Sequence, residues 1–271
     1  MKGPQLLEQY AGRLVTRAGA CFLGERAVFR GLDLHAALKD MDWLELYLFG
    51  ITGRRFTPAQ MKVLHAIWVY TSYPDARIWN NRVAALAGST RSTASLGVAA
   101  ALAVSDARIY GGGTSLRAIE FLLEARLGVE RGEPLGDLVA AALRVGYIMG
   151  FGRPISAADE RIEPMLALLR DHGLDHGAHV ELAFLVEKIL VGRNPALRIN
   201  YAGLVAAVAA DFGFSPREYH LFRIPSFLAG MPPCYLEAAE KPPGLLFPLP
   251  CRVILYEGVS RRPWRGSTPK T

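Results

Sequence analysis

The stretch "TPAQMKVLHAIWVYTSY", residues 57–73, begins with residue types typical of a helix N-terminus and decides the fold class expected for this chain. Thr57 is a residue type that caps helix N-termini, and Pro58 occupies the first helical position, where no intrahelical hydrogen bond is lost. Apolar residues then recur at spacings of three and four, which is the period of a helix with one buried face. The stretch therefore predicts a long helix that packs against a core.

The same helical period continues through most of the chain. Residues 33–53 show it, with Asp33 expected as the N-cap and Gly53 as the residue that ends the helix. Strand signal is confined to "ERAVFRG" (25–31) and "CRVILYEG" (251–258). Further helices are expected in the ranges 92–105, 136–149, 158–173, 177–192, 200–213 and 219–231. We predict an all-α protein with at most a small sheet.

Composition narrows the class of protein. The 271 residues are 51% hydrophobic and carry a net charge of +6, with Arg and Lys scattered along the chain. This favours a small anionic ligand over nucleic acid, which calls for clustered positive charge. "MKGPQLLEQY" (1–10) lacks the apolar run of a signal peptide, and no run is long enough to cross a bilayer. We expect a soluble, cytoplasmic protein with no membrane contact and reduced cysteines.

Generic site motifs are few. His172, His176 and His179 lie in a glycine-broken connection, which is either a metal-binding loop or a solvated turn between helices. "YGGGTS" (110–115) lacks the Lys and the preceding strand of a phosphate-binding P-loop. We expect no metal site and no permanently bound cofactor.

A glycine-flanked arginine is the most distinctive local feature. In "YIMGFGRPISAADERIEPML" (147–166), Gly150 and Gly152 form a tight turn that presents Arg153, and Arg161 follows at the start of a helix. Guanidinium groups bind carboxylates and phosphates through paired hydrogen bonds. Arg153 is either such an anion ligand or a salt-bridged structural arginine.

Six stretches in order resemble the citrate synthase family, and in particular its short forms, citryl-CoA lyase and the lyase module of ATP-citrate lyase. The resemblance runs from about residue 24 to residue 258. The stretches are "ERAVFRGLDL" (25–34), "LYLFGITGRRFTPAQ" (46–60), "DARIYGGG" (106–113), "YIMGFGRP…DER" (147–161), "LVEKI…NPALRINYAGLVAAVAADFGF" (185–214) and "SFLAGMPPCYLEAAE" (226–240).

This resemblance implies an all-α, citrate synthase-like fold with a large and a small domain. The large domain would be discontinuous, residues 1–110 and 201–271, and the small domain would span residues 111–200. A coenzyme A thioester would bind in the cleft between them as a substrate, with a small carboxylate as the second ligand. The resemblance also implies a homodimer, or a heterodimer with an active paralogue.

The family's catalytic positions are mostly replaced in this chain. The family's chemistry is of the Claisen type, in which a carboxylate takes the proton next to the thioester and histidines stabilise the enolate. The resemblance places Ser72, Tyr110 and Arg153 where the family has histidines, although an aromatic residue also occurs at the position of Tyr110 in ATP-citrate lyase. It places Ala202 at the aspartate and Phe227 at a substrate-binding arginine.

Part of the binding set is retained. Arg161 matches the arginine of the family's Asp-Pro-Arg motif, and Asn200 and the turn glycines, Gly150 and Gly152, are also kept. Because Ala202 has no proton chemistry, ordinary citrate synthase activity is not expected.

Two functions follow from this pattern. The first is a divergent enzyme that makes or breaks a C–C bond in an acyl-CoA, a transferase or lyase. It would use Arg153 and Arg161 as anion ligands, Tyr110 as a hydrogen-bond donor and Asp75, beside Ser72, as the base. The alternative is a non-catalytic homologue that binds a ligand or serves as the partner subunit of an active paralogue. The basic tail, residues 259–271, is expected to be flexible. Trp264 within it either contacts an acidic partner or nucleic acid, or belongs to a loose, solubilising terminus.

Overall fold

The computed structural model describes residues 3–12, 14–154, 158–245, 251–253 and 255–259, without the side chains of Leu6 and Cys251. Most of the predicted basic tail, residues 260–271, lies outside this range. The helices are α1 (Pro4–Tyr10), α2 (Trp43–Thr52), α3 (Pro58–Thr71), α4 (Trp79–Ser89), α5 (Ala94–Val104), α6 (Gly112–Glu130), α7 (Leu135–Val145), α8 (Ile162–Asp171), α9 (Ala178–Arg193), α10 (Tyr201–Asp211), α11 (Pro216–Arg223) and α12 (Met231–Glu240). Two 3₁₀ helices, η1 (Ile224–Gly230) and η2 (Cys251–Val253), complete the helical elements.

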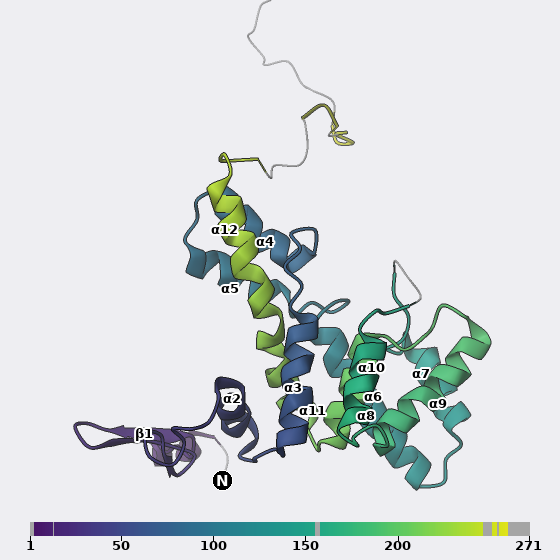
Figure 1. Ribbon diagram of the computed structural model, residues 1–271, viewed down its shortest axis with the longest axis horizontal. Coiled ribbons are helices and arrows are strands. Elements are labelled where there is room, and N and C mark those ends of the chain that lie inside the picture. The colour runs from purple at the N-terminus through teal and green to yellow at the C-terminus, as the bar shows by residue number, and fades with distance from the viewer. Residues whose placement is uncertain (1–2, 13, 155–157, 246–250, 254, 260–271) are drawn as a thin grey trace, which may run out of the picture.

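The main core is built around α10, at the centre of a bundle with α6, α8, α9 and α11 (Figure 1). Every residue of α10 from Gly203 to Ala210 is buried, because its small and apolar side chains leave no face suited to water. Side chains of α2 and α3 belong to the same core cluster.

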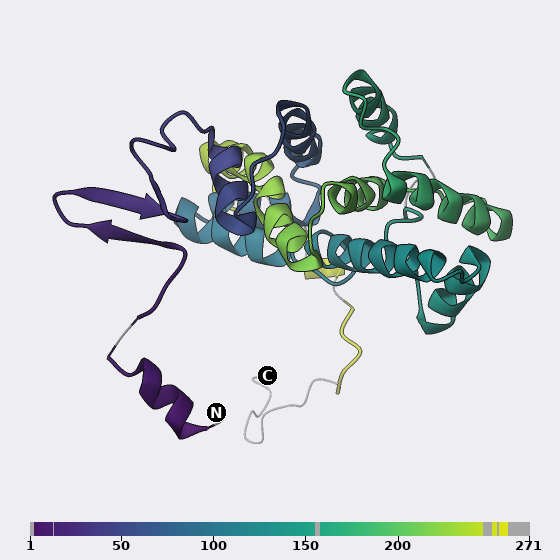
Figure 2. The ribbon, with the colours of Figure 1, turned by 90° about the horizontal axis from the view of Figure 1, so that it is seen from below.

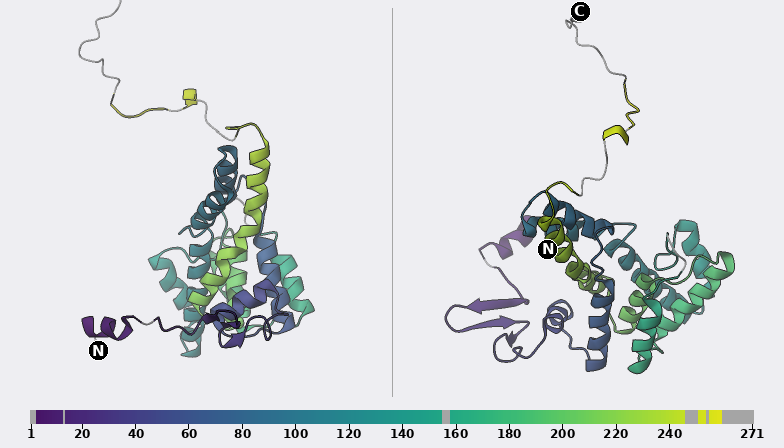
Figure 3. Two further views of the ribbon diagram at one scale, coloured as in Figure 1. Left: turned by 90° about the vertical axis from the view of Figure 1, so that its left-hand side faces the viewer. Right: turned by 45° about the horizontal axis from the view of Figure 1, so that its top comes forward.

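A second layer of helices, α4, α5 and α12, stands beside this bundle (Figures 1 and 3). Small residues allow these helices to approach closely. A Cβ atom added at Gly88 would lie 2.2 Å from the backbone oxygen of Tyr235 in α12, and one at Gly97 would lie 2.6 Å from the Cβ atom of Ala87. The Ala- and Gly-rich sequence of this layer therefore specifies its tight packing.

The small sheet lies near the N-terminus and extends away from the helices (Figure 2). Strands β1 (Gly19–Phe22), β2 (Arg26–Phe29) and β3 (Leu32–Asp33) pair antiparallel in the order β1-β2-β3. Arg30 attaches the sheet to α2, since its guanidinium donates hydrogen bonds to the carbonyl oxygens of Gly50 and Ile51 at the end of that helix.

Most predicted helices are present, and the capping predictions are partly right. Thr57 caps α3 in a reciprocal capping box with Gln60, and Gly53 ends α2 in the left-handed region at φ 72°. The expectation for Asp33 is wrong, because α2 begins only at Trp43, with Asp42 as its cap. The Asp33 carboxylate instead accepts hydrogen bonds from the N–H groups of residues 35 and 36 and closes a local turn.

The prediction of a second strand, at residues 251–258, is wrong for the described residues. Within 251–253 and 255–259, the described part of "CRVILYEG", the chain forms a 3₁₀ turn and no strand. A strand needs a neighbouring strand to satisfy its backbone groups, and the strands of the described residues all lie in the N-terminal sheet. Helices α1, α4, α6 and α12 were not among the predicted ranges. Across the described residues, no helix is both long and apolar enough to cross a membrane.

Candidate active site

The glycine turn at Gly150–Gly152 lies against the N-terminus of α10. Gly150 and Gly152 have φ angles of 95° and 79°, which strongly favour glycine. The Asn200 side chain caps α10, accepting a hydrogen bond from the N–H of Gly203 and donating one to the carbonyl of Gly152 at 2.7 Å. Asn200 and the two glycines therefore hold the turn in place, which explains why these residue types occur together.

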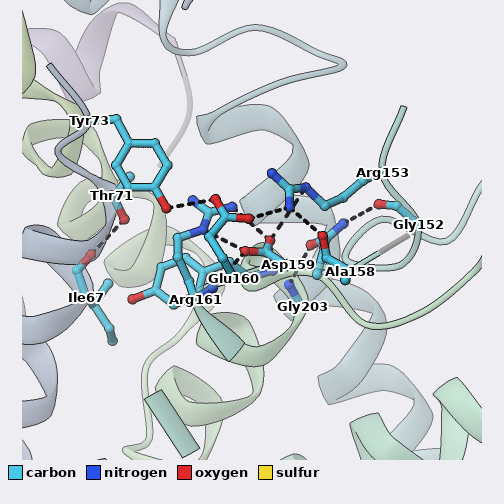
Figure 4. Close-up of polar contacts among 12 residues, drawn as sticks. Ile67, Thr71, Tyr73, Gly152, Arg153, Ala158, Asp159, Glu160, Arg161 and Gly203 are labelled. Carbon is cyan, nitrogen blue, oxygen red and sulfur yellow. Dashed lines mark hydrogen bonds and ion pairs between the residues drawn. The ribbon is translucent and has the colours of Figure 1, made fainter. Parts of the chain in front are cut away.

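Arg161 is fixed just before α8 by a buried carboxylate. The Nε and Nη2 atoms of Arg161 each lie 2.8 Å from an oxygen of Asp159, whose side chain is fully buried. The guanidinium also lies over the ring of Tyr201 at 4.6 Å from the ring centre and near Tyr73 at 5.5 Å (Figure 4 shows the polar contacts). Arg161 is thus a rigid, oriented cation.

Asp159 connects three parts of the site. Besides Arg161, it accepts a hydrogen bond from the backbone N–H of Tyr201 at 2.8 Å. Burial by itself would raise the pKa of Asp159, but the hydrogen bonds and positive charge of Arg161 more than offset it and hold the pKa below 3.8. The carboxylate is ionised across the physiological range.

We predict that Asp159→Asn lowers the free energy of unfolding by about 2 kcal/mol at pH 7, because it leaves Arg161 without its charge partner. The penalty is moderated because the Arg161 side chain is 22% exposed. Since the folded-state pKa of Asp159 is lowered, its stabilisation is present above about pH 3.8 and is lost as the pH falls through the folded value. Urea unfolding of both proteins from pH 7 to pH 2.5 should show the difference shrinking at the acid end. A difference that stays constant with pH would contradict this assignment.

Arg153 is engaged by its own loop. Its Nη1 donates to the carbonyl of Ala158 at 2.7 Å and to Glu160 at 2.8 Å, and its Nε lies 3.9 Å from Asp159. Tyr73 donates to the other oxygen of Glu160, so that Tyr73 and Arg153 approach this carboxylate from opposite sides (Figure 4). Of the two roles left open by the sequence, this geometry favours the salt-bridged structural arginine.

Ser72 and Asp75 also have local partners. The Ser72 hydroxyl lies 2.7 Å from the carbonyl oxygen of Trp68 and 3.2 Å from that of Ser226, which ties the end of α3 to η1. Asp75 accepts hydrogen bonds from Arg77, which lower the pKa of its carboxyl to about 2. A carboxylate with so low a pKa is a weak base, so this geometry does not support the predicted role of Asp75.

A cavity of about 160 Å³ opens beside Arg161. Its walls come from the end of α3 and the loop after it, from the start of α4, from the 110–111 turn and from η1. Tyr110, the predicted donor, lines it together with Trp79, whose ring centre is 6.2 Å away. The buried amides Asn80 and Asn81 complete one wall. The structure thus brings Tyr110 and Arg161 to one cavity, while Arg153, Asp75 and Ser72 do not line it.

Arg223, which was not among the predicted site residues, lies directly behind this cavity. The residue is only 3% exposed; its Nη1 contacts the Thr71 hydroxyl at 3.3 Å, and its guanidinium lies 5.3 Å from the ring centre of Phe227. Both Thr71 and Phe227 line the cavity. No carboxylate of the described residues forms an ion pair with Arg223, and its Nε has no hydrogen-bond partner among them.

The surroundings of Arg223 hold further buried polar groups. The hydroxyls of Tyr201 and Tyr219 are buried and interact electrostatically with Arg223. The Tyr201 hydroxyl has no hydrogen-bond partner within the described part of the chain, whereas Tyr219 interacts with Ser115. Burial lowers the pKa of Arg223, which reflects the cost of holding a charge away from water. A buried cation normally has a counter-charge, and here an anion in the adjoining cavity could supply part of it.

The sequence contains a signal for Arg223 that our prediction did not use. Tyr219, Phe222 and Ser226 are all buried, so Arg223 occupies the apolar face of its helix, at the spacing reserved for core residues. Arg223 also stands four residues before Phe227, the position that the resemblance assigns to a substrate-binding arginine, and its guanidinium packs against the Phe227 ring.

Other candidate sites are weaker. A cavity of about 490 Å³ between α8 and α9 is an open surface groove, with Arg170 and Glu181 among its lining residues, and contains no buried cation. Among the described residues, no cluster of His, Cys, Asp and Glu has metal-binding geometry. His179 instead contacts Asp211 at 2.8 Å, and that carboxylate accepts hydrogen bonds from the backbone at the start of α9.

Comparison with solved structures identifies the fold. No protein-family model matches this chain, and no curated protein sequence matches it. Citryl-CoA lyase from Hydrogenobacter thermophilus superimposes with a TM-score of 0.80 at 20% identity, over 92% of this chain and 96% of that one. A ternary complex of citrate synthase from Thermoplasma acidophilum with carboxymethyl coenzyme A and oxaloacetate gives 0.62 at 19% identity, over 82% and 58%. ATP citrate lyase from Methanothrix soehngenii, in complex with citrate and coenzyme A, gives 0.74 at 14% identity, over 96% and 45%.

The chain therefore has a citrate synthase-like fold of about the size of citryl-CoA lyase, which confirms the predicted all-α, citrate synthase-like class. It spans about half the length of the citrate synthase and ATP citrate lyase chains.

Proposed function

We propose that this protein binds a small carboxylate-bearing acyl-coenzyme A and makes or breaks a C–C bond in it. The main observation in support is the cavity beside Arg161, with Arg223 buried behind it and without an ion-pair partner among the described residues. Arg161 lines the cavity, and Arg223 lies behind its lining residues Thr71 and Phe227. Both guanidinium groups favour an anion in the cavity, because the surrounding protein screens charge far less than water does. Similar solved structures were determined with coenzyme A derivatives and with oxaloacetate or citrate, which supports this ligand class.

The residues divide into three roles in this proposal. Arg161 and Arg223 stabilise the ligand's carboxylate or a developing enolate oxygen. Tyr110 is placed to donate a hydrogen bond from the cavity wall. Asn200 and the two turn glycines position the loop that carries Asp159, which in turn orients Arg161.

The cavity has lining residues from both predicted domains. Thr71, Trp79 and Phe227 belong to the predicted large domain, residues 1–110 and 201–271. Gly111 and Arg161 belong to the predicted small domain, residues 111–200. We propose that the cavity lies at the boundary of two domains that close on the ligand, although the main hydrophobic core extends across both.

Calorimetric titration with acetyl-CoA, free coenzyme A and oxaloacetate tests the proposed function. We expect dissociation constants in the micromolar range for acetyl-CoA or coenzyme A. Because Arg153 is held by Glu160, Arg153→Ala should change them less than threefold. A folded protein that binds none of these ligands at millimolar concentration would exclude the proposal.

The alternative function, a non-catalytic partner subunit, is favoured by a specific observation. The aspartate position of the family is held by Ala202, and the carboxylates of Asp75, Asp159 and Glu160 are each paired with an arginine. Under this alternative, the ligand binds without turnover and an active paralogue carries out the reaction.

We also propose that the protein is a homodimer formed through α5. This helix, "ASLGVAAALAV", carries no charged residue, and its outward face exposes Leu96, Ala99, Ala100, Ala103 and Val104. An uncharged apolar face can meet its own copy across a two-fold axis without charge repulsion. Ala100→Asp should therefore convert the dimer to a monomer in sedimentation experiments, because it buries two carboxylates. A wild-type monomer that dimerises only with a paralogue would favour the heterodimer.

A further inference from the structure

The cavity beside Arg161 contains no obvious proton acceptor. Its lining includes an arginine, two amides, a threonine hydroxyl and aromatic side chains, but no carboxylate or imidazole from the described residues. Burial raises the pKa of the Tyr73 hydroxyl, and its hydrogen bond to Glu160 raises it further. The phenol is therefore poorly suited to act as a base near neutral pH.

The nearest carboxylates are also poor bases. The pKa of Glu160 is lowered, first by a hydrogen bond from its own backbone and then by Arg153. Asp159 is occupied by Arg161, and Asp75 by Arg77. A carbon acid next to a thioester is weak, and a carboxylate that is paired with an arginine and has a lowered pKa takes its proton slowly. This arrangement is ill suited to forming an enolate by proton removal.

The same arrangement suits enolate formation by loss of carbon dioxide. That step needs no base, since the electron pair comes from the bond to the departing carboxylate. It is favoured where a carboxylate loses its water beside apolar walls, such as those formed by Trp79, Ile78 and Phe227. It also requires fixed positive charge near the thioester oxygen, which Arg161 supplies from the cavity wall and Arg223 from behind the lining residue Phe227.

We infer that the substrate is a 2-carboxyacyl thioester, which this site decarboxylates to generate its carbanion. This inference rests on the proposed function, because it assumes that the cavity takes an acyl thioester. The bond between the α-carbon and the carboxylate breaks, and carbon dioxide leaves. The electron pair passes into the thioester as an enolate whose oxygen faces the guanidinium groups. A proton from water then adds to the α-carbon, so that the products are carbon dioxide and the shorter acyl thioester.

Malonyl-CoA and acetyl-CoA in deuterated water distinguish the two ways of forming the enolate. We expect the protein to convert malonyl-CoA to acetyl-CoA that carries deuterium in its methyl group, with release of carbon dioxide. Acetyl-CoA itself, in the same solution, should retain its protons. Exchange of acetyl-CoA protons as fast as malonyl-CoA turnover would overturn the inference, because it would show that a base is present.

Two further comparisons complete the test. Arg223→Met should lower kcat/KM for malonyl-CoA decarboxylation at least 50-fold, whereas Arg126→Met, which removes a partly exposed arginine on α6, should leave it within twofold. If calorimetry shows that both thioesters bind and malonyl-CoA remains intact after a day, the inference fails while the proposed function survives. If neither thioester binds, both are excluded.

Discussion

Replacing Arg223 by methionine is expected to weaken binding of a carboxylate-bearing thioester about 50-fold and, at the same time, to raise the melting temperature. The loss in affinity corresponds to about 2.3 kcal/mol, the size expected for a charge about 7 Å from a ligand anion at an effective dielectric constant of about 20. The gain in stability arises because the wild-type protein buries this guanidinium without a carboxylate partner among the described residues. Methionine has a similar length and no charge to desolvate, so we expect a gain of about 1 kcal/mol, or about 3 °C.

Calorimetric titration and thermal unfolding, performed on the same preparations, measure both effects. Arg126→Met is the matched control, because this arginine is partly exposed on α6, does not line the cavity and pairs with Glu130. It should change neither affinity nor melting temperature appreciably. A lower melting temperature in Arg223→Met, with unchanged affinity, would mean that Arg223 is a structural residue and that the cavity is not an anion site.

Gly203→Ala is expected to destabilise the protein by about 4 kcal/mol, which would lower the melting temperature by about 10 °C. A Cβ atom at Gly203 would lie 2.3 Å from the carbonyl oxygen of Gly150 and 3.0 Å from its carbonyl carbon. Both are backbone atoms of a turn that Asn200 fixes by hydrogen bonds, so neither can move without separating the turn from α10. The φ angle of Gly203 is not positive, and the effect therefore comes from the steric overlap alone.

Gly136→Ala provides the control for this substitution. Gly136 lies within α7, and an added Cβ atom would meet nothing within 4 Å. Alanine favours the helix by up to about 1 kcal/mol over glycine, so this variant should be as stable as the wild type or slightly more stable. Equal effects of the two substitutions in urea unfolding would contradict the close approach of Gly150 and Gly203.

Local signals in the sequence account for much of the secondary structure. The capping box of Thr57 and the left-handed Gly53 were predictable because caps and glycine turns depend on residues within one helical turn of each other. The apolar run of α10 likewise marks a helix buried on every side. Asp33 misled the prediction because a short acidic side chain closes a local turn as readily as it starts a helix.

The arrangement of the candidate site could be predicted less well from local signals in the sequence. Arg161, Asn200 and the glycines Gly150 and Gly152 stand in recognisable motifs, and the structure gives each a defined local geometry. Their role in ligand binding stays a prediction. Arg153 and Asp75 looked like free functional groups in the sequence. Each has a partner within seven residues, Glu160 and Arg77, and which of several nearby charges will pair depends on how the loop folds.

The sequence by itself determined the helical class, the helix caps and the identity of the residues that could carry charge to a site. Only the tertiary structure decided which of these charged side chains lack an ion-pair partner and adjoin a cavity. Arg223 stands far along the chain from Thr71 and Arg161, and its importance comes from burial beside a cavity that those residues line. The physical reason is that the cost of an unpaired charge depends on the solvent and the partners around it, and folding alone fixes both.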